Sequence, residues 1–268
     1  MVDPRANFTG SMPEFYDSCL GPAWFESFAA DLAGRLPPKP PGDVLEIACG
    51  TGIVTRRMRE HLDPSIRLVA TDLSKAMLDF ARTKLGDREG IEWREADAVR
   101  LPFGDAQFGG VVCAFGLMFV TDKEAALREA RRVLGPGGTL LFNVWDRIEA
   151  NPHALAFSEV IEGLFPGDAE MRLRGPYEMG DPASLEGMLT AAGFKEIRID
   201  TKRVQCGPVS ARKIAIGHIR GSPRSALIEK RGVPVDRAVE LATAAIAKVG
   251  GADPYGGSAQ AVVVEARS

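Results

Sequence analysis

Three acidic residues could together bind a ligand that contains an ammonium group, a ribose and an adenine. Glu46 lies inside an apolar run, Asp72 ends the next apolar run, and Asp97 ends the third. A buried carboxylate requires a partner that offsets its desolvation, and a cationic ammonium group is such a partner. Carboxylates at strand ends can accept hydrogen bonds from a ribose diol and from an adenine amino group. Simpler roles stay open for each: a structural hydrogen bond for Glu46, a helix cap for Asp72 and a turn for Asp97.

A glycine-containing turn follows the first apolar run. It reads Gly50-Thr51-Gly52 and leads into a helix-like segment that begins at Ile53. Glycines let a ligand lie against the backbone, and a helix start provides free N–H groups and positive partial charge. A dinucleotide fingerprint would place a third glycine where this chain has Thr55, and a P-loop would place a lysine after Gly52. The turn therefore predicts an adenosine-containing ligand without a pyrophosphate.

The segments that must position these residues alternate regularly along the chain. Five strands alternating with helices predict a parallel, doubly wound α/β sheet, and the second half of the chain adds two more strands. Strands are expected at 43–48, 66–72, 91–96, 110–115, 139–145, 194–204 and 261–265, and helices at 52–61, 74–85 and 122–134.

Additional helices flank this alternation. Residues 11–36 predict one or two helices, with Gly21-Pro22 able to start the second. Asn151-Pro152 and Asp181-Pro182 are typical helix starts, and 209–249 predicts two or three helices between the last two strands. The sheet does not need this last block, so we expect it to form a lid.

Composition excludes several classes of function. The chain has 268 residues, a formal net charge of −3 and a hydrophobic fraction of 45%. Nucleic-acid binding usually requires a basic surface, and a membrane span requires roughly 18–20 consecutive apolar residues; the sequence has neither. The first residues lack the features of a secretory signal, and the four cysteines lack metal-ligand spacing. We therefore expect a cytoplasmic protein with free thiols, no metal, no nucleic-acid partner and no membrane span.

Four motifs in order resemble those of class I S-adenosylmethionine-dependent methyltransferases. Another stretch, Phe115-Gly116-Leu117-Met118-Phe119-Val120-Thr121-Asp122-Lys123, is similar to the corresponding stretch of the ubiquinone/menaquinone C-methyltransferase branch. The resemblance covers residues 43 to about 146 and implies S-adenosyl-L-methionine as cofactor. The four motifs are Glu46-Ile47-Ala48-Cys49-Gly50-Thr51-Gly52, Thr71-Asp72-Leu73-Ser74-x-x-Met77, Ala96-Asp97-Ala98-x-x-Leu101-Pro102-Phe103 and Leu134-Gly135-Pro136-Gly137-Gly138-Thr139-Leu140.

The resemblance also implies a fold, a division of the chain and a set of cofactor-binding residues. The fold is a Rossmann-like, doubly wound, seven-stranded sheet, mostly parallel with an antiparallel last strand, plus a helical cap. Within one overall domain, 1–42 would cover the cofactor site, 43–146 would bind the cofactor, and 147–268 would complete the sheet and carry a substrate cap at about 150–180 and 209–249. The expected cofactor-binding residues are Glu46, Ala48, Gly50, Thr51 and Gly52 around the methionine portion, Asp72 at the ribose, Leu73 and Met77 against adenine, Asp97 and Ala98 at its edge, Phe115 on the sulfonium side, and Tyr16 over the carboxylate end.

Methyl transfer sets few requirements for catalytic groups. The reaction is an in-line displacement that needs near-attack geometry and exclusion of water. An oxygen or carbon acceptor usually requires removal of a proton, whereas a neutral nitrogen does not. His61 is expected to close a helix, and His153 and His218 are more readily interpreted as solvated helix or lid residues. The sequence therefore assigns no catalytic base.

The methyl acceptor is expected to be a small molecule. In the quinone branch the Phe-Gly-Leu stretch continues with a polar pair, whereas this chain continues with Met118-Phe119. This departure and the aromatic residues of the second half predict an apolar pocket for a mostly apolar or aromatic metabolite. The expected pocket residues are Leu117, Phe119, Trp145, His153 and Tyr177.

Two rival functions and the oligomeric state stay open. A protein could bind S-adenosylmethionine without catalysis, because its donor motifs would be the same. A nicotinamide-dependent oxidoreductase would have the same fold, although Thr55 and the Asp97 motif argue against it. The expected function is transfer of a methyl group to an oxygen, carbon or nitrogen acceptor, with release of S-adenosylhomocysteine.

Overall fold

The computed structural model describes residues 10–86, 90–172 and 174–268. Seven strands form a single sheet in the order β3-β2-β1-β4-β5-β7-β6. The pairs from β3 to β5 are parallel, whereas β7 runs antiparallel to both β5 and β6. The expected fold class, with an antiparallel last strand, is therefore confirmed. The strands are β1 (Val44–Ile47), β2 (Leu68–Asp72), β3 (Ile91–Glu95), β4 (Phe108–Ala114), β5 (Leu134–Trp145), β6 (Lys195–Gln205) and β7 (Ser258–Arg267).

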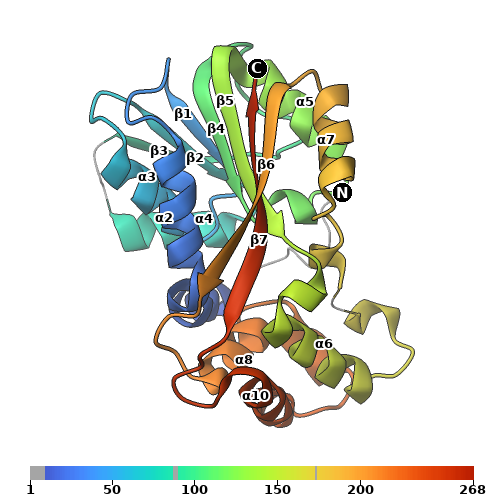
Figure 1. Cartoon of the computed structure of the whole chain (residues 1–268). Helices are drawn as coiled ribbons and strands as arrows, with labels where there is room; N and C mark the ends of the chain where they lie inside the picture. Colours follow the sequence, from blue (N-terminus) through green and yellow to red (C-terminus); the bar gives the residue numbers. More distant parts are fainter. Residues whose placement is uncertain (1–9, 87–89, 173) are drawn as a thin grey trace.

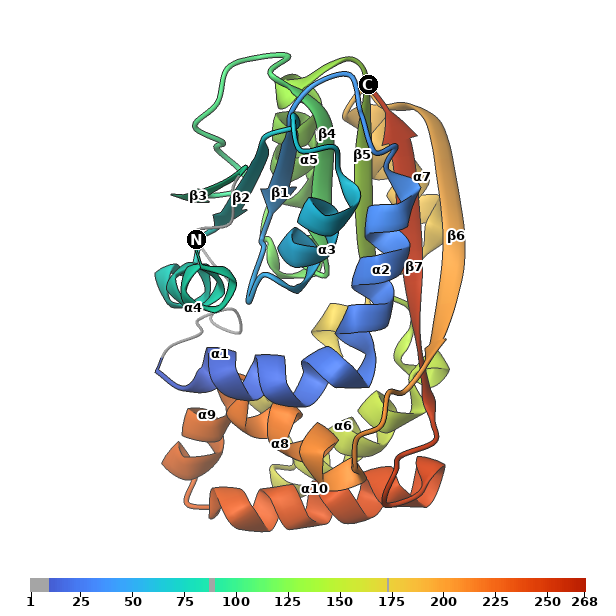
Figure 2. The ribbon, with the colours of Figure 1, turned by 90° about the vertical axis from the view of Figure 1, so that its left-hand side faces the viewer.

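Helices cover both faces of the sheet. Figure 1 shows α2 and α3 on one face and α5 and α7 on the other, and Figure 2 shows the same layers from the side. The helices are α1 (Met12–Phe15), η2 (Tyr16–Phe25), α2 (Glu26–Arg35), α3 (Ile53–His61), α4 (Lys75–Leu85), α5 (Lys123–Val133), α6 (Pro152–Leu164), α7 (Pro182–Ala191), α8 (Ala211–Arg220), α9 (Arg224–Lys230) and α10 (Val235–Gly250), with 3-10 turns at η3 (Leu117–Phe119), η4 (Ile148–Ala150), η5 (Ala169–Met171) and η6 (Gly175–Tyr177).

The central strands explain the apolar runs of the sequence. Every residue of β1 is buried, as are nearly all residues of β4, because helices cover both faces of a parallel sheet. The chain leaves β1 towards β2 and leaves β4 towards β5, so the direction of the sheet reverses between them. Ligands of open α/β sheets bind at the carboxyl ends of the strands beside such a reversal. The residues that follow β1, β2 and β4 are therefore the expected ligand-binding residues of this fold.

Two chain segments form a helical layer beyond the carboxyl ends of the strands. One segment lies between β5 and α7 and carries α6, and the other lies between β6 and β7 and carries α8, α9 and α10. Helix α10 packs against α6 and α8, and the long strands β6 and β7 extend down to this layer (Figure 1). We call this layer, residues 147–181 and 206–257, the cap.

The N-terminal segment, residues 12–35, is one continuous helical run, of which α1 and η2 lie between the sheet and the cap and α2 lies beside α3 on one face of the sheet (Figure 2). Its middle part, η2, is a π-helix, and Pro22 lies inside it. Of the one or two helices expected for residues 11–36, the structure has one continuous run, and no second helix starts at Gly21-Pro22. A proline disrupts a regular α-helix because it lacks an N–H and clashes with the preceding turn, and the wider π-helical turns accommodate it.

Two strand boundaries also differ from those expected. The glycine run that was expected to precede the fifth strand lies inside β5, which begins at Leu134, and the pairing with β4 shifts between Phe108 and Gly110. Strand β7 extends from Ser258 to Arg267 rather than over 261–265, because its flanking residues pair with β6. Within the described part of the chain, no helix combines the length and apolar character needed to cross a membrane.

Candidate active site

The turn after β1 has the backbone conformation that its glycines predict. Gly50 has φ +55°, and an added Cβ would meet no atom within 4 Å. Its N–H donates to Asp72 Oδ2 at 2.8 Å, which fixes the turn to the end of β2. Ala48, directly before the turn, also has a positive φ of 55°, an uncommon conformation for a residue with a side chain. The turn thus exposes its backbone towards open space beside two strand ends.

Gly52 has a different role from Gly50. It is the N-cap of α3 with φ +78°, and an added Cβ would lie 3.1 Å from both Ala81 and Leu85 of α4. It does not line either of the cavities described below. Gly52 therefore permits close packing of the turn against α4.

Glu46 is a buried carboxyl group whose chemistry depends on its neighbours. Its side chain is 1% exposed, and Oε2 accepts a hydrogen bond from Thr55 Oγ1 at 2.5 Å. Burial raises the pKa of Glu46 to about 8, with a smaller upward effect from Asp72 and a downward effect from Thr55. A cationic group placed beside it would favour the ionised form. Thr55 stands where a dinucleotide fingerprint would have its third glycine, and its hydroxyl donates the hydrogen bond that holds the Glu46 carboxyl group in place.

A small cavity beside Glu46 fits the amino-acid end of the cofactor. It measures about 50 Å³ and is lined by Glu46, Thr51, Tyr16 and Phe115 among others. The hydroxyl of Thr51 is buried there without a hydrogen-bond partner. A buried hydroxyl without a partner is unfavourable, and a carboxylate or amino group of a ligand would satisfy it. The residues present thus fit the methionine portion of S-adenosylmethionine.

Asp72 and Asp97 provide carboxylates at the ends of the next two strands. Besides Gly50, Asp72 accepts from the N–H of Ser74 through Oδ1 at 2.7 Å. Burial raises the pKa of Asp72, against the effect of these backbone N–H groups. Asp97 Oδ1 accepts from the N–H of Val99 at 3.1 Å. A carboxylate offers about four lone-pair sites, so both side chains can accept further hydrogen bonds from a ligand.

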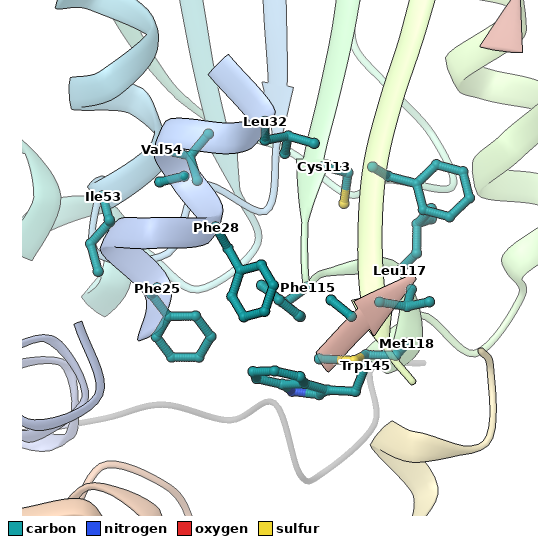
Figure 3. Close-up of a cluster of buried hydrophobic side chains, with 14 of the residues drawn as sticks. Phe25, Phe28, Leu32, Ile53, Val54, Cys113, Phe115, Leu117, Met118 and Trp145 are labelled. Atoms are coloured by element: carbon teal, nitrogen blue, oxygen red, sulfur yellow. The ribbon is translucent and has the colours of Figure 1, made fainter. Parts of the chain in front are cut away.

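Phe115 follows β4 and is the residue expected on the sulfonium side of the cofactor. It has φ +53°, and its N–H donates to both the carbonyl and the side-chain Oδ1 of Asn143 at 3.0 Å. Its ring lies 4.3 Å from that of Trp145 and 5.2 Å from that of Phe28, measured between centroids. Figure 3 shows this aromatic cluster, which also contains Phe25. Buried Asn143 thus fixes a strained strand end inside an apolar wall.

A single large cavity joins the expected cofactor site to the expected acceptor pocket. Its volume is about 1110 Å³, and it extends from Asp72 and Asp97 to Trp145 and Tyr177. Of the residues expected from the sequence, those that line it are Tyr16, Ala48, Gly50, Asp72, Leu73, Met77, Asp97, Ala98, Phe115, Phe119, Trp145 and Tyr177.

Two residues expected in the acceptor pocket lie elsewhere. The side chain of Leu117 is buried in the core and Met118 lines the cavity instead, because the tight turn η3 rotates neighbouring side chains apart. His153 is 0% exposed, so the interpretation as a solvated helix residue is wrong. Its ring lies behind the cavity wall, 4.1 Å from that of Trp24 between centroids.

Several residues of the cavity wall were not expected from the sequence. They come from η2, η3, α8 with its C-cap residue, and α9, segments that are distant in sequence and meet only in the folded chain. The aromatic pattern of 15–28 indicated a helix but not its buried face. These lining residues are Leu20, Trp24, Phe25, Met118, Gly217, His218, Gly221 and Arg224.

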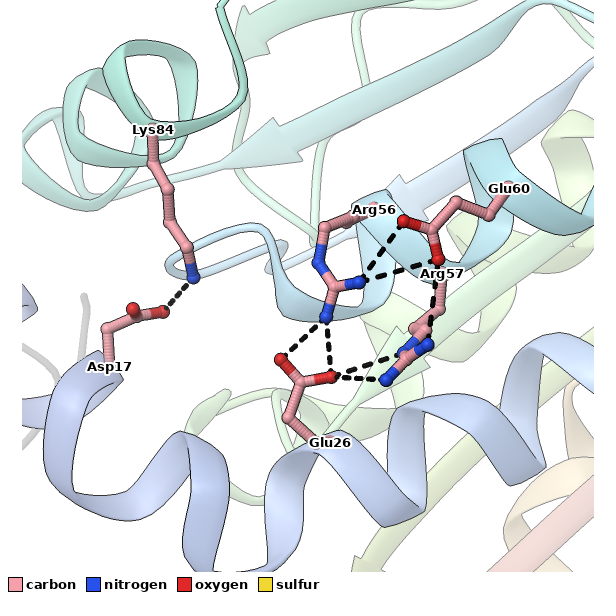
Figure 4. Close-up of polar contacts among 6 residues, drawn as sticks. All are labelled: Asp17, Glu26, Arg56, Arg57, Glu60 and Lys84. Carbon is pink, nitrogen blue, oxygen red and sulfur yellow. Dashed lines mark hydrogen bonds and ion pairs between the residues drawn. The ribbon is translucent and has the colours of Figure 1, made fainter.

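Ion pairs fasten the N-terminal segment over the cofactor side (Figure 4). Asp17 of η2 pairs with Lys84 of α4 at 2.6 Å, and Glu26 of α2 pairs with Arg56 and Arg57 of α3 at 2.6 and 3.0 Å. These contacts join the N-terminal helical segment, residues 12–35, to α3 and α4, the helices that follow β1 and β2. We call this segment the cover. His61, at the end of α3, hydrogen-bonds the carbonyl of Leu36 at 2.8 Å. No cluster of three or more metal-ligating side chains occurs among the residues that the structure describes.

The strand order and the carboxylates beside the reversal define a class I S-adenosylmethionine-dependent methyltransferase. A methyltransferase domain model matches residues 45–142. The chain is 34% identical over 187 residues to the ubiquinone/menaquinone biosynthesis C-methyltransferase UbiE of Ectopseudomonas mendocina, a match that covers 65% of this chain and 72% of that protein. The chain therefore belongs to this methyltransferase family, in the branch that resembles the ubiquinone/menaquinone C-methyltransferases.

Solved structures show the same fold. An S-adenosylmethionine-dependent methyltransferase from Mesorhizobium loti superposes with a TM-score of 0.51 at 21% identity, covering 91% of this chain and 100% of that chain. Phosphoethanolamine N-methyltransferase 2 of Haemonchus contortus, in complex with S-adenosyl-L-methionine, superposes with a TM-score of 0.61 at 16% identity and covers 98% and 58%. These structures confirm the fold, whereas the matching methyltransferase domain and the 34% identical relative confirm the expected enzyme class and cofactor.

Proposed function

We propose that this enzyme transfers a methyl group from S-adenosylmethionine to a small, mostly apolar or aromatic metabolite held inside the molecule. The observation that carries the proposal is the cavity of about 1110 Å³ that continues past the cofactor-binding strand ends into the cap. Ligand pockets usually measure roughly 300–1,000 Å³, so this cavity has room for a donor and a second molecule.

The composition of the far wall supports an apolar acceptor. Phe119, Trp145, Phe157 and Tyr177 line it, and the Trp145 and Tyr177 rings stack with centroids 6.0 Å apart. Met118 and Phe119 line it where the quinone branch has a polar pair. Aromatic rings stack favourably with planar ligands and exclude water. An aromatic or conjugated acceptor fits this wall better than a charged polymer.

The chain's own residues would promote the reaction mainly by position. When bound, the cofactor supplies a methyl group on a positively charged sulfur, which is already activated for displacement. Asp72 and Asp97 would hold the nucleoside end, and Glu46 with Thr51 would hold the amino-acid end. Phe115 and Trp145 would keep water away from the line of attack.

Methylation of a ring carbon of a quinone precursor is a second candidate. The relative that is 34% identical carries C-methyltransferase in its name, and it is matched over most of its length. The substitution of the polar pair by Met118-Phe119 argues for a different acceptor. Both candidates require the same donor site and differ in the groups that must contact the acceptor.

Titration and a substrate panel test the proposal. Isothermal titration with S-adenosylmethionine, S-adenosylhomocysteine and NADH should give heat with the first two ligands only. Incubation with labelled donor and a panel of small metabolites should label small aromatic compounds. Preferential labelling of tRNA or of a protein would overturn the proposed acceptor class. The cytoplasmic location expected from the sequence stays a prediction, which fractionation of expressing cells would test.

A further inference from the structure

A positively charged side chain lies in the cap side of the large cavity. Arg224 of α9 lines the cavity, and its guanidinium carbon lies 5.8 Å from the centroid of the Phe157 ring. It does not line the small cavity beside Glu46 that fits the amino-acid end of the cofactor. The other charged side chains of the large cavity, within the described part of the chain, belong to the segments that follow β2, β3 and β4; they are Asp72, Lys75, Asp79, Asp97 and Asp122.

Helix α9 holds this arginine in a defined place in the cap. Ile228 of α9 is 0% exposed, and Arg231, the residue after the helix, pairs with Asp168 and with Glu170 of η5. Arg224 itself is half-buried. Water screens a charge less in such a position than on an open surface, so an opposite charge placed beside it would be attracted more strongly.

Tyr177 adds a second hydrogen-bond donor to this part of the wall. It lines the same cavity, and its hydroxyl can donate to a ligand. Burial raises the pKa of Tyr177, and the positive charge of Arg224 acts on it in the opposite direction. The two groups are therefore within electrostatic reach of each other, and the hydroxyl stays protonated at neutral pH. A guanidinium has five N–H donors and a phenol has one, so the natural partner of both is an acceptor-only anion.

A row of aromatic rings connects this polar corner to the expected position of the reacting methyl group. The centroids of Phe115 and Trp145 lie 4.3 Å apart, and those of Trp145 and Tyr177 lie 6.0 Å apart with planes inclined by 26°. Phe115 is the residue expected on the sulfonium side. A planar molecule that stacks along this row would have one end at the cofactor and the other end at Arg224.

We propose that Arg224, together with Tyr177, binds the carboxylate of an aromatic acid, so that the methyl acceptor is a planar monoanion that is methylated away from its carboxylate. The inference rests on the proposed function and specifies the acceptor class of that site. The parallel N–H groups of a guanidinium match the two oxygens of a carboxylate. One arginine balances one negative charge, whereas a doubly charged group would keep an uncompensated charge in an apolar wall.

Two probes of the same shape test the charge directly. They are 2-naphthoate and 2-naphthamide, which share their rings and differ in the charge of the terminal group. The protein is first saturated with S-adenosylhomocysteine, so that the probes bind only in the remainder of the cavity. Isothermal titration at pH 7 should show that the wild-type protein binds the naphthoate at least about tenfold more tightly, the discrimination expected of a charge-assisted hydrogen bond.

Three variants assign the preference to a residue. Arg224→Met removes the charge, keeps a long side chain against Phe157, and should abolish the preference. Arg224→Lys keeps the charge without the planar fork and should retain part of it. Arg212→Met is the matched control, because Arg212 of α8 is exposed and does not line the cavity; it should retain the full preference. All three variants should bind S-adenosylhomocysteine with the wild-type Kd.

Turnover locates the carboxylate relative to the methyl group. For an aromatic acid that the enzyme methylates, Arg224→Met should raise KM at least about tenfold and leave kcat nearly unchanged, because the contact is the same in the ground state and the transition state. NMR of the product should show the new methyl group away from the carboxylate. Formation of the methyl ester would overturn the proposed orientation.

Other outcomes would also overturn the inference. Equal binding of the two probes by the wild-type protein would refute the carboxylate site without any variant, and a preference that persists in Arg224→Met would refute the residue assignment. Loss of S-adenosylhomocysteine binding by a folded Arg224→Met protein would assign the arginine to the donor instead. Methylation of neutral aromatic compounds with no preference for acids would refute this inference and leave the proposed function intact, whereas absence of methylation of every small molecule would refute both.

Discussion

Glu46 is a carboxyl group placed where its neutral form is favoured until a cation arrives. It lies in a fully buried strand beside Thr55, and burial raises its pKa to about 8. An unfolded chain would release this proton near pH 4.3, the ordinary value for glutamate. Above about pH 4.3 this raised pKa therefore lowers the stability of the folded protein, and a ligand's ammonium group beside Glu46 would offset the loss.

We predict that Glu46→Gln changes the pH dependence of stability in the unliganded protein. Between about pH 4.3 and 8 the folded state holds a proton that the unfolded state has lost, so wild-type stability falls as pH rises through this window. Glutamine is neutral throughout and can still accept from Thr55. Urea unfolding at pH 5 and pH 8 should show the variant gaining on the wild type at the higher pH. Parallel changes in the two proteins would contradict the raised pKa.

We predict that Asp72→Ala weakens binding of S-adenosylhomocysteine by at least about tenfold. One hydrogen bond to a charged group contributes roughly 1.5–3 kcal/mol, and the substitution also releases the turn that Gly50 fixes to β2. Isothermal titration measures the effect. Asp72→Asn keeps one acceptor oxygen and should bind with intermediate affinity, whereas Asp105→Ala, at an 80% exposed side chain, should bind normally.

At the scale of the elements, the cover and the cap approach each other unusually closely. A Cβ added at Gly217 of α8 would lie 2.7 Å from Leu20 and 2.8 Å from Cys19, both in η2. A Cβ added at Gly221 would lie 2.8 Å from the backbone nitrogen of Tyr16. These two glycines let the π-helix lie directly on α8, and this contact places Trp24 and Tyr16 at the cavity.

We predict that Gly217→Ala lowers the free energy of unfolding by about 1–3 kcal/mol, the usual effect of overpacking a well-packed contact. Gly34→Ala in α2 is the matched control, because an added Cβ there meets nothing within 4 Å. Replacing glycine inside a helix normally stabilises by roughly 0.5–1 kcal/mol, so the control should gain stability. Chemical denaturation of both variants checks the opposite signs. A gain in both would show that η2 yields without strain.

The sequence predicts the elements around the donor site well for a physical reason. Glu46 and Asp72 lie in the buried strands β1 and β2, and local hydrophobic pattern locates such strands; Asp97 follows β3, a more exposed strand. The π-helix at 16–25 and the start of β5 at Leu134 could not be predicted from local pattern, because their conformations depend on packing and strand pairing with distant segments. Seven strands could be placed from the pattern, although the length of β7 could not.

The acceptor wall could be predicted only in part. Trp145 and Tyr177 were expected and line the cavity, but His218 and Trp24 were not expected there. Their positions depend on how η2 rests on α8, a contact between segments nearly two hundred residues apart. No local pattern encodes such a contact, and a histidine in a helix carries no sign of the cavity it faces.

At the scale of the whole molecule, one cavity is lined both by residues at the ends of the sheet's strands and by residues of the N-terminal segment. Its wall includes Asp72 at the end of β2 and Tyr16 in η2. A ligand that contacts both must stabilise both, because binding to the folded state alone shifts the unfolding equilibrium. A ligand bound in this cavity would therefore link the stability of the N-terminal segment to that of the strand ends.

We predict that S-adenosylhomocysteine at a hundred times its Kd raises the free energy of unfolding by about 2.7 kcal/mol. Amide hydrogen exchange should slow in η2 as well as at the carboxyl ends of β1 and β2, because the ligand bridges them. Asp72→Ala at the same ligand concentration provides the control, and with a tenfold weaker affinity it should gain only about 1.4 kcal/mol, roughly half the effect on the wild type. Protection confined to the strand ends would contradict the proposed contact with the cover.

The pairing of β6 with β7 has a consequence for protein engineering. The two strands meet in register up to Gln205 and Ser258, so the cap segment 206–257 leaves and re-enters the sheet at facing positions. A segment inserted at such a point can be exchanged without altering the rest of the sheet. We expect that grafting the corresponding segment of a relative between Gln205 and Ser258 alters which molecules are methylated, provided that the graft keeps the glycines that let α8 lie on η2. Because Gln205 and Ser258 face each other, the segment 206–257 can be exchanged as a unit between two paired strands.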